Sequence, residues 1–444
     1  MPDSVPTQSD SPRTDVALLP HLEPVQLIDQ HGRARVNRPR ADAPRIDAPH
    51  TDAPSTDAPS TDASRIDGSR IDVPPTGAPY AMPDTERLVE GYRQLVIGRR
   101  VNDQASALVR QGRLAVYPSS HGQEACEVAA ALSLADTDWL FPTYRDTVAV
   151  LARGVDPVEA FVLLRGDWHG GYDPHRHNVA TQSTPLATQL LHAVGFAHAA
   201  KLRGEDTVVL AMCGDGATSE GDFHEALNFA AVFHLPVVFL VQNNGYAISV
   251  PLSRQTAAPS LAHKAIGYGM PGRRVDGNDL AAMLAVLTDA VASARTDGGP
   301  TLIEAVTYRI ESHTNADDAT RYRSDDEVAP WRERDPLIRM RSYLGSIGAL
   351  SDGDDAAMHA QAERVATILR DAMNAESEPR VSDLFDFVYA SRTPQLNEQA
   401  AMLADELERD ALAEDEQHGD EPQRDEPAHD RREQHRAPIG GDPA

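Results

Sequence analysis

Two short polar segments of this sequence carry residue types that could bind a metal and an anion together. In the first, Asp215 stands between Gly214 and Gly216; in the second, Asn244 follows Asn243, and 26 residues separate the two segments. Carboxylate and amide oxygens are ligands that magnesium takes while it keeps phosphate oxygens in its shell. The glycines let the backbone come close to an anion. Together the two segments predict a site for a magnesium-bridged diphosphate.

The sequence around these segments predicts the elements that bring them together. Residues 207–213 and 236–241 are short apolar runs typical of buried strands, and residues 221–234 have apolar side chains at helical spacing. A strand, a helix and a strand of these lengths form a right-handed unit with parallel strands. Both polar segments then leave the carboxyl ends of adjacent strands, where α/β sheets bind ligands. Without this context, Gly-Asp-Gly would indicate only a turn.

The Gly-Asp-Gly segment at 214–216 and the Asn-Asn pair at 243–244 resemble the thiamine-diphosphate motif. Their surroundings, Ala-Thr-Ser-Glu-Gly-Asp-Phe-His-Glu-Ala-Leu-Asn-Phe-Ala at 217–230 and Gly-Tyr-Ala-Ile-Ser at 245–249, resemble the alpha subunit of the decarboxylating first component of 2-oxo-acid dehydrogenase complexes. The similarity extends over about residues 83–393. It implies the thiamine-diphosphate-binding fold of the pyruvate and branched-chain 2-oxo-acid dehydrogenase family, an α/β fold whose central, mostly parallel sheet is flanked by helices.

The resemblance also implies which residues hold the cofactor and its ions. Magnesium is bound by Asp215, Asn244 and the backbone carbonyl of Tyr246. The residues that match cofactor contacts are Tyr144, Arg145, Thr184, Leu186, Gly214, Asp215, Gly216, Ala217, Asn244, Tyr246 and His313. In some members a potassium ion braces the neighbouring loop, and its matching ligands are Ser183, Pro185, Thr188 and Gln189. Gln242 is a departure, because the family often has an arginine there that contacts a phosphate.

Arg145 is expected to meet an anion on physical grounds as well. It lies at the predicted start of a helix, where a cation opposes the helix dipole unless an anion is bound there. In the resembling family, the matching tyrosine and arginine contact the diphosphate. The alternative interpretation is a surface salt bridge.

Two histidines are candidates for catalysis. His313 lies in a polar loop after the apolar run 301–308. This loop resembles the mobile loop of the family, whose histidine touches the cofactor phosphates and helps to transfer the acyl group to lipoyl lysine. His121 lies in the loop at 117–121, which the family places near the active site. The alternative for His121 is an ordinary loop histidine.

The sequence accounts for only half of the active site that such an enzyme needs. A carboxylate must meet the aminopyrimidine ring of thiamine diphosphate so that its reactive carbanion can form. The chain has no second α/β half of comparable size to supply it, and in the family this glutamate comes from a separate beta chain. The resemblance therefore implies an α2β2 heterotetramer, a small 2-oxo acid as substrate, and the lipoyl domain of the acyltransferase component as a further partner.

Several functional alternatives remain open at this point. The substrate could be pyruvate or a branched-chain 2-oxo acid, and an acetoin dehydrogenase alpha subunit is a related possibility. A catalytically silent, cofactor-binding regulatory chain belongs to another class, but intact Asp215, Asn244 and His313 argue against it. A self-sufficient non-oxidative decarboxylase would need its own activating glutamate and usually a longer chain.

Composition divides the chain into three parts. Residues 1–80 are rich in proline, aspartate, serine and threonine and contain five-residue repeats, which predicts disorder, except that residues 24–32 could form a strand and turn that docks on a partner. Residues 81–395 form the predicted dehydrogenase domain. Residues 396–444 are acidic and poor in apolar side chains, which predicts a disordered tail. Helices are expected from Asp84 to Leu108, and at 260–267, 280–295, 335–344, 355–374 and 381–390.

Charge and cysteine content limit the partners and the compartment. The formal net charge of −27 argues against sequence-independent binding to nucleic acid or to anionic lipid. No apolar run reaches 18 residues, and the first residues do not resemble a signal peptide, so neither membrane insertion nor secretion is expected. Cys126 and Cys213 have no metal-binding or CxxC spacing, which favours the reducing cytoplasm.

Overall fold

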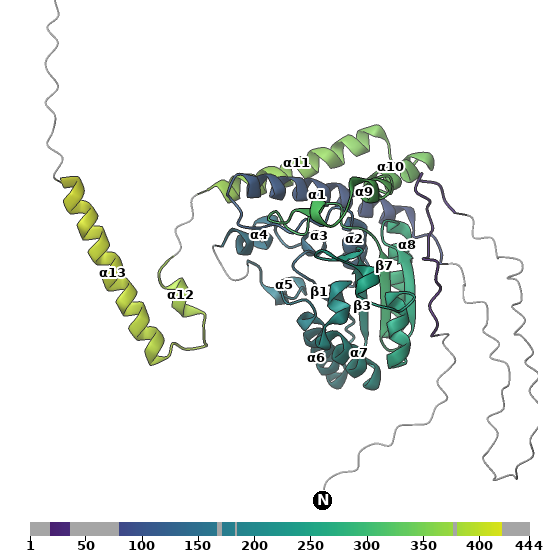
Figure 1. The fold of residues 1–444 in the computed structure, drawn as a ribbon, viewed down its shortest axis with the longest axis horizontal. Helices are drawn as coiled ribbons and strands as arrows, with labels where there is room; N and C mark the ends of the chain where they lie inside the picture. Colours follow the sequence, from purple (N-terminus) through teal and green to yellow (C-terminus); the bar gives the residue numbers. More distant parts are fainter. Residues whose placement is uncertain (1–17, 36–79, 167–170, 183, 376–379, 420–444) are drawn as a thin grey trace, which may run out of the picture. The chain divides into compact units, whose positions relative to one another are not determined.

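The computed structural model describes residues 18–35, 80–166, 171–182, 184–375 and 380–419 (Figure 1). The chain divides into two compact units, residues 1–376 and 377–444. The five-residue repeats and residues 420–444, for which composition predicts disorder, lie outside the described residues. Within the described residues, no helix combines the length and the apolar character needed to cross a bilayer.

A five-stranded parallel sheet forms the centre of the first unit. Its strands are β1 (Trp139–Phe141), β2 (Val209–Gly214), β3 (Val237–Asn243), β6 (Gly272–Asp276) and β7 (Thr301–Val306). They lie in the order β1-β2-β3-β7-β6, and every neighbouring pair is parallel. A separate antiparallel pair joins β4 (Tyr246–Ala247) to β5 (Val250–Pro251). The predicted strand, helix and strand at 207–241 are confirmed as β2, α7 and β3.

Helices cover the sheet on both faces, and the predicted α/β fold is confirmed (Figure 1). The α-helices of this unit are α1 (Thr85–Arg110), α2 (Glu124–Leu132), α3 (Thr147–Ala152), α4 (Pro157–Arg165), α5 (Pro174–His177), α6 (Thr188–Arg203), α7 (Gly221–Val232), α8 (Leu280–Arg295), α9 (Asp325–Arg332), α10 (Pro336–Ser346) and α11 (Asp352–Asn374). Short 3-10 helices are η1 (Gly216–Ser219), η2 (Leu252–Arg254), η3 (Leu261–Tyr268) and η4 (Ala319–Arg321).

Alternate residues of the strands point into two separate apolar clusters. Leu210 and Met212 of β2 join the cluster that contains α1, α2 and α8. Val209, Ala211 and Cys213 of the same strand join the cluster that contains α6 and α7. Because both faces are covered, β2 and β3 are near-continuous apolar runs, as parallel strands usually are. The polar residues that follow them are therefore held on a rigid support.

An N-terminal arm, residues 18–35, packs on the free edge of this sheet. The Val25 N–H donates to the Arg274 carbonyl, and the Asp276 N–H donates to the Val25 carbonyl, both at 2.9 Å. The N–H groups of Leu27 and Ile28 both donate to Asp279 Oδ2 at 2.7 Å. In the described structure this segment packs on the unpaired edge of β6 of the same chain, and docking on a partner stays a prediction.

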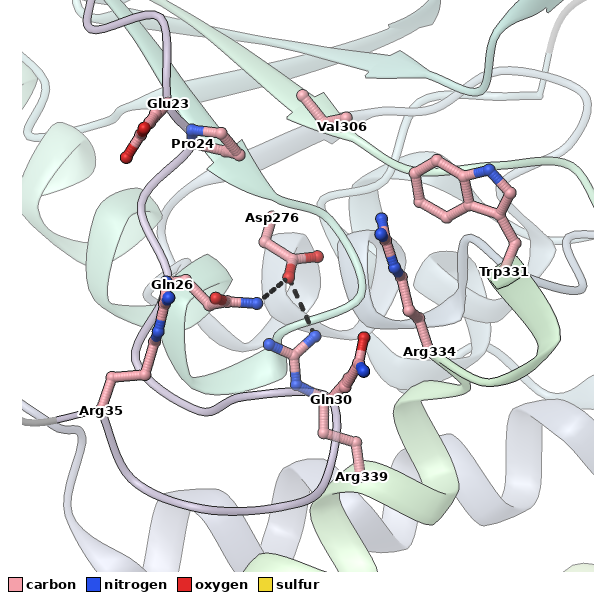
Figure 2. Close-up of a pocket in the computed structure, with 10 residues that line it drawn as sticks. All are labelled: Glu23, Pro24, Gln26, Gln30, Arg35, Asp276, Val306, Trp331, Arg334 and Arg339. Carbon is pink, nitrogen blue, oxygen red and sulfur yellow. Dashed lines mark hydrogen bonds and ion pairs between the residues drawn. The ribbon is translucent and has the colours of Figure 1, made fainter.

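Charged groups tie the arm to α10 (Figure 2). Arg339, which is 2% exposed, forms ion pairs with Asp276 at 3.0 Å and with Asp279 at 3.3 Å, and also donates to the Ile28 carbonyl. Gln26 Nε2 donates to Asp276 Oδ2 at 2.7 Å. A cavity of about 300 Å³ lies beside these groups, between the arm and the segment from α9 to α10. The arm is therefore part of the folded unit.

Removing residues 1–35 is expected to lower the melting temperature, whereas removing residues 1–17 should leave it unchanged. The longer deletion takes Leu27 and Ile28 out of the core, and burial of such a side chain contributes roughly 1.5–3 kcal/mol. It also leaves Asp279 without two backbone donors. We expect a decrease of roughly 5–15 °C, measured by circular dichroism on both truncated chains. Equal melting temperatures for the two deletions would contradict the packing described for the arm.

The second unit departs from the prediction made for the C-terminal residues. It contains α12 (Asp383–Asp386) and α13 (Pro394–Gly419). The predicted helix at 381–390 is reduced to four residues, and the part of the predicted disordered tail that the structure describes belongs to α13. Alanine, leucine, glutamate and glutamine predominate in α13, and these are strong helix formers. An acidic composition therefore does not prevent a helix at this position.

Candidate active site

The register of the sheet brings the two predicted polar segments together. Gly214 at the end of β2 pairs with Gln242 near the end of β3, so Asp215 and Asn244 leave neighbouring strands at the same edge. Gly216 begins η1, which the sequence did not predict between β2 and α7. A Cβ atom at Gly216 would lie 2.7 Å from Ala247 Cβ, so only glycine lets β4 pass this close.

Asp215 presents a buried carboxylate that is only half satisfied. The residue is 1% exposed, and its Oδ2 accepts a hydrogen bond from Gln255 Nε2 at 2.6 Å. Its Oδ1 is buried without a hydrogen-bond partner. Burial raises the pKa of Asp215, while the Gln255 hydrogen bond counteracts this shift. A buried acceptor without a donor is destabilising, and a cation would satisfy it.

Asn244 and Tyr246 supply the other two predicted metal ligands. Asn244 Oδ1 accepts from the Tyr246 N–H at 3.2 Å. Two tyrosine hydroxyls, those of Tyr246 and Tyr308, donate to Glu327 at 2.8 and 3.0 Å, which holds β4 against α9. Among the described residues, no group of three or more His, Cys, Asp or Glu side chains could hold a metal. One carboxylate with amide and carbonyl oxygens instead fits magnesium that keeps phosphate oxygens as ligands.

Arg309 also belongs to this site, although its position in the sequence predicted no role for it. It is 1% exposed, and it donates to the carbonyl groups of Tyr246 at 3.4 Å and Ile248 at 2.7 Å. Its pKa is lowered by burial and then by the charge of Arg145. Two neighbouring guanidinium groups with mutual repulsion favour binding of an anion between or beside them. The Tyr-Arg pair directly after β7, at the same edge of the sheet, was the available signal.

Arg145, Tyr144 and His313 lie together, as predicted. Arg145 Nη2 donates to the His313 carbonyl and lies 3.1 Å from His313 Nδ1, and its Nη1 donates to the Ser119 carbonyl at 2.9 Å. The Tyr144 ring makes an edge contact with the imidazole of His313, with ring centres 6.2 Å apart. Within the described residues Arg145 forms no ion pair with a carboxylate, so the salt-bridge alternative is not supported. This leaves its positive charge available for an anion.

His313 is held in its neutral form. Burial, then the charges of Arg145 and Arg309, lower its pKa from the usual 6.5 to about 4. Because Arg145 donates toward Nδ1, the proton of the neutral ring lies on Nε2. The His313 N–H donates to Asp317 Oδ2 at 2.8 Å, which fixes the backbone of the loop.

Binding of a diphosphate is expected to raise the pKa of His313. Without it, His313 titrates at about 4; a nearby anion offsets the charges of Arg145 and Arg309 and favours the imidazolium. Because the folded-state pKa lies below the unfolded value, this group stabilises the fold above pH 6.5, and that contribution is lost as the pH falls through 4. An NMR titration of the histidine ring, with and without thiamine diphosphate, measures the shift. A pKa near 6.5 in the cofactor-free protein would contradict this environment.

His121 lies at the same edge but has different neighbours. Its Nδ1 lies 3.2 Å from Glu311 Oε1, and its carbonyl accepts from the Ile310 N–H. It lines a cavity of about 270 Å³ together with Trp331 and residues of the 310–311 segment. Within the described residues, no hydrogen bond links His121 to Asp215 or His313. The catalytic role of His121 therefore stays a prediction.

The loop before α6 contains the predicted contacts to the cofactor ring and to potassium. Thr184, Pro185 and Leu186 are exposed, and Ser183 lies outside the described residues. Thr188 Oγ1 donates to Asp222 Oδ2 at 3.0 Å. Gln189 Nε2 donates to the carbonyl groups of Leu186 at 3.2 Å and of Met212 at 2.9 Å, while its Oε1 is buried without a partner. That oxygen is the one observation in this loop that fits a bound cation.

The site thus holds a carboxylate with an unpartnered oxygen, two buried arginines and a neutral histidine. They lie at the carboxyl edge of a parallel sheet, where α/β proteins bind ligands, and their charges suit an anion that carries a metal ion. Residues 92–382 match the family model described as the dehydrogenase E1 component. The chain is 53% identical over 318 residues to the 3-methyl-2-oxobutanoate dehydrogenase subunit alpha of Mycobacterium tuberculosis (strain CDC 1551 / Oshkosh), covering 72% of this chain and 87% of the relative.

A second relative belongs to the same family. It is the pyruvate dehydrogenase E1 component subunit alpha of Staphylococcus aureus (strain Mu50 / ATCC 700699), 39% identical over 316 residues, which cover 71% of this chain and 85% of the relative. The chain belongs to the dehydrogenase E1 component family, as alpha subunit of a thiamine-diphosphate-dependent 2-oxo-acid dehydrogenase that works with a beta subunit in a multienzyme complex. The alternatives of an acetoin dehydrogenase subunit and a silent regulatory chain are not favoured by these relatives.

Proposed function

We propose that this alpha subunit acts on a branched-chain 2-oxo acid, with 3-methyl-2-oxobutanoate as the representative substrate. The observation that supports this choice is the difference in identity over alignments of nearly equal length, 53% to the relative named for that acid and 39% to the one named for pyruvate. A substrate panel with the reconstituted enzyme tests it. A higher kcat/KM for 3-methyl-2-oxobutanoate than for pyruvate is expected, and the reverse order would contradict the proposal.

The proposed metal is magnesium, held by Asp215, Asn244 and the Tyr246 carbonyl. The unpartnered Oδ1 of Asp215 supports this assignment. Bound thiamine diphosphate supplies a carbanion as nucleophile and a ring that accepts electrons after decarboxylation. Arg145 and Arg309 are placed to neutralise the diphosphate. Potassium is proposed at Gln189 with Ser183, Pro185 and Thr188, and the cofactor ring is proposed to contact Thr184 and Leu186.

The residues of this chain would mainly bind and orient the cofactor, and His313 would move a proton. When bound diphosphate raises the pKa of His313, the imidazolium can donate its Nε2 proton to an acceptor that approaches from the side away from Arg145, and the ring returns to its neutral form. In the proposed reaction that acceptor belongs to the lipoyl group of the acyltransferase component, which takes the acyl group. His121 is linked to Glu311, which lies on the loop that carries His313, and is proposed to face the substrate.

An α2β2 heterotetramer is the proposed assembly. Helices α6 and α7 expose large apolar side chains; Leu202, Phe229, Val232 and Phe233 are 77%, 51%, 59% and 42% exposed. Apolar surface of this kind on one face is typical of a protein interface. The beta subunit would also supply the carboxylate that meets the aminopyrimidine ring. We further propose a cytoplasmic location, which is supported by the two unpaired, buried cysteines.

A further inference from the structure

Four buried side chains form a line of hydrogen bonds that ends at the proposed metal ligand Asn244. Asp146 Oδ1 accepts from Gln242 Nε2 at 2.6 Å. Gln242 Oε1 then accepts from Gln123 Nε2 at 3.2 Å. Gln123 Oε1 in turn accepts from Asn244 Nδ2 at 2.8 Å. All four residues are buried: Asp146 directly precedes α3, Gln123 directly precedes α2, Gln242 lies near the end of β3, and Asn244 directly follows β3.

The line has a direction, which is set at its two ends by the Asp146 carboxylate and by the Tyr246 N–H that donates to Asn244 Oδ1. An amide side chain can turn over and exchange its oxygen and nitrogen, whereas a carboxylate only accepts hydrogen bonds. The other carboxylate oxygen of Asp146 is occupied by the Thr143 N–H at 2.7 Å. Gln242 must therefore present its nitrogen to Asp146 and its oxygen to Gln123.

The same constraint passes along the line to Asn244. Since Gln123 must use its nitrogen toward Gln242, its oxygen faces Asn244. Asn244 then uses its nitrogen toward Gln123, and its oxygen is left on the side of the Tyr246 N–H. A single reversed amide would place two N–H groups or two oxygens against each other away from water, which is strongly unfavourable.

We propose that Asp146 is a positioning residue which, through Gln242 and Gln123, fixes the Asn244 amide with its oxygen toward the metal. This inference rests on the magnesium site proposed above. A metal ligand is usually held by hydrogen bonds to residues that do not touch the metal. Removing such a residue typically lowers metal affinity by about 10- to 100-fold. Asp146 would have this effect although it is separated from Asn244 by two side chains.

Asp146→Asn is the test variant, because it keeps the shape and reverses the direction. The Thr143 N–H still requires an oxygen, so the new amide must turn its nitrogen toward Gln242. Gln242 and Gln123 then turn over, and Gln123 presents N–H groups to Asn244. Asn244 must either turn over against the Tyr246 N–H or face Gln123 with N–H against N–H, and both arrangements disturb the metal ligand. Calorimetric titration of magnesium into the complex with the beta subunit, at saturating thiamine diphosphate, should show about a 10- to 100-fold loss of affinity.

A second substitution should restore the direction. In the double variant Asp146→Asn with Gln242→Glu, the carboxylate moves one position along the line and accepts from both of its neighbours. Gln123 and Asn244 then return to their original orientation, and magnesium affinity should return to within about threefold of the unchanged protein, well inside the 10- to 100-fold loss expected for the single variant. A purely structural role for Asp146 does not predict this rescue. Gln123→Met, which removes the acceptor for Asn244 without adding charge, should weaken magnesium even if Asp146→Asn fails to fold.

Asp279→Asn is the control, because it neutralises another fully buried carboxylate outside the line, and it should leave magnesium affinity unchanged. If the unchanged protein binds the cofactor without magnesium, the proposed metal site fails. If it requires magnesium, but Asp146→Asn or Gln123→Met keeps full affinity, or the double variant is not restored, the positioning role of Asp146 is overturned.

Discussion

Replacing Asp215 with alanine is expected to remove measurable magnesium-dependent binding of thiamine diphosphate, and with it the decarboxylase activity. Asp215 is the only carboxylate of the proposed metal site, and its unpartnered Oδ1 is the strongest acceptor there. Loss of that charge weakens the metal and the diphosphate that the metal bridges. We expect cofactor affinity in calorimetry to fall by about 100-fold or more, beyond the loss seen for residues that only support a ligand.

Glu225→Ala is the matched control for Asp215. It removes a carboxylate from the same strand, helix and strand unit, but at an exposed position of α7. Its cofactor affinity should equal that of the unchanged enzyme. Asp215→Ala with unchanged cofactor affinity would refute the assignment of the metal site.

Replacing His313 with alanine is expected to affect the two half-reactions unequally. The proposed role of His313 is proton donation during transfer of the acyl group, and such proton transfers contribute typically about 10²- to 10⁴-fold. Transfer to a lipoyl domain should therefore fall by this factor. Decarboxylation measured with an artificial electron acceptor should fall less, because the loss there is only that of a contact beside the diphosphate.

His359→Ala provides the comparison for His313. His359 lies on α11, where its imidazole is 59% exposed and its nearest carboxylate is that of Asp355 at 3.7 Å. Both half-reactions should keep their rates in this variant. An equal decrease of both half-reactions in His313→Ala would show that the histidine only organises the loop.

The positions of Asp215 and Asn244 could be predicted from the sequence, because the patterns that place them lie within one short stretch of the chain. Apolar periodicity predicted β2, α7 and β3, and parallel pairing then placed Asp215 beside Asn244. The contact of Arg145 with His313 links residues 168 positions apart. It could be expected only from the resemblance to a family, since no pattern within the chain connects the two segments.

The contributions of Arg309 and Gln255 could not be predicted in the same way. Arg309 binds carbonyl groups of the β4 segment, and Gln255 binds the Asp215 carboxylate from 40 positions away. Both contacts depend on how loops fold over the edge of the sheet. Composition and spacing carry no signal for Gln255, and the only signal for Arg309 is the position of the Tyr-Arg pair shortly after β7.

At each end of the chain, the structure describes an ordered segment that extends beyond the order predicted from composition. A possible strand and turn were predicted at residues 24–32, and the free edge of β6 and the Asp279 carboxylate satisfy the backbone of the longer arm, residues 18–35. At α13, the acidic character of the sequence concealed a run of strong helix formers. Average composition over a long window therefore hides helical propensity.

Carbon dioxide release by the purified chain, with and without its beta subunit, tests the central claim most directly. The assay contains 3-methyl-2-oxobutanoate, thiamine diphosphate, magnesium and an artificial electron acceptor. The chain alone should show no turnover above background, because it lacks the carboxylate that meets the aminopyrimidine ring, and turnover should appear when the beta subunit is added. Robust turnover by the chain alone would contradict the conclusion that it forms half of a shared active site.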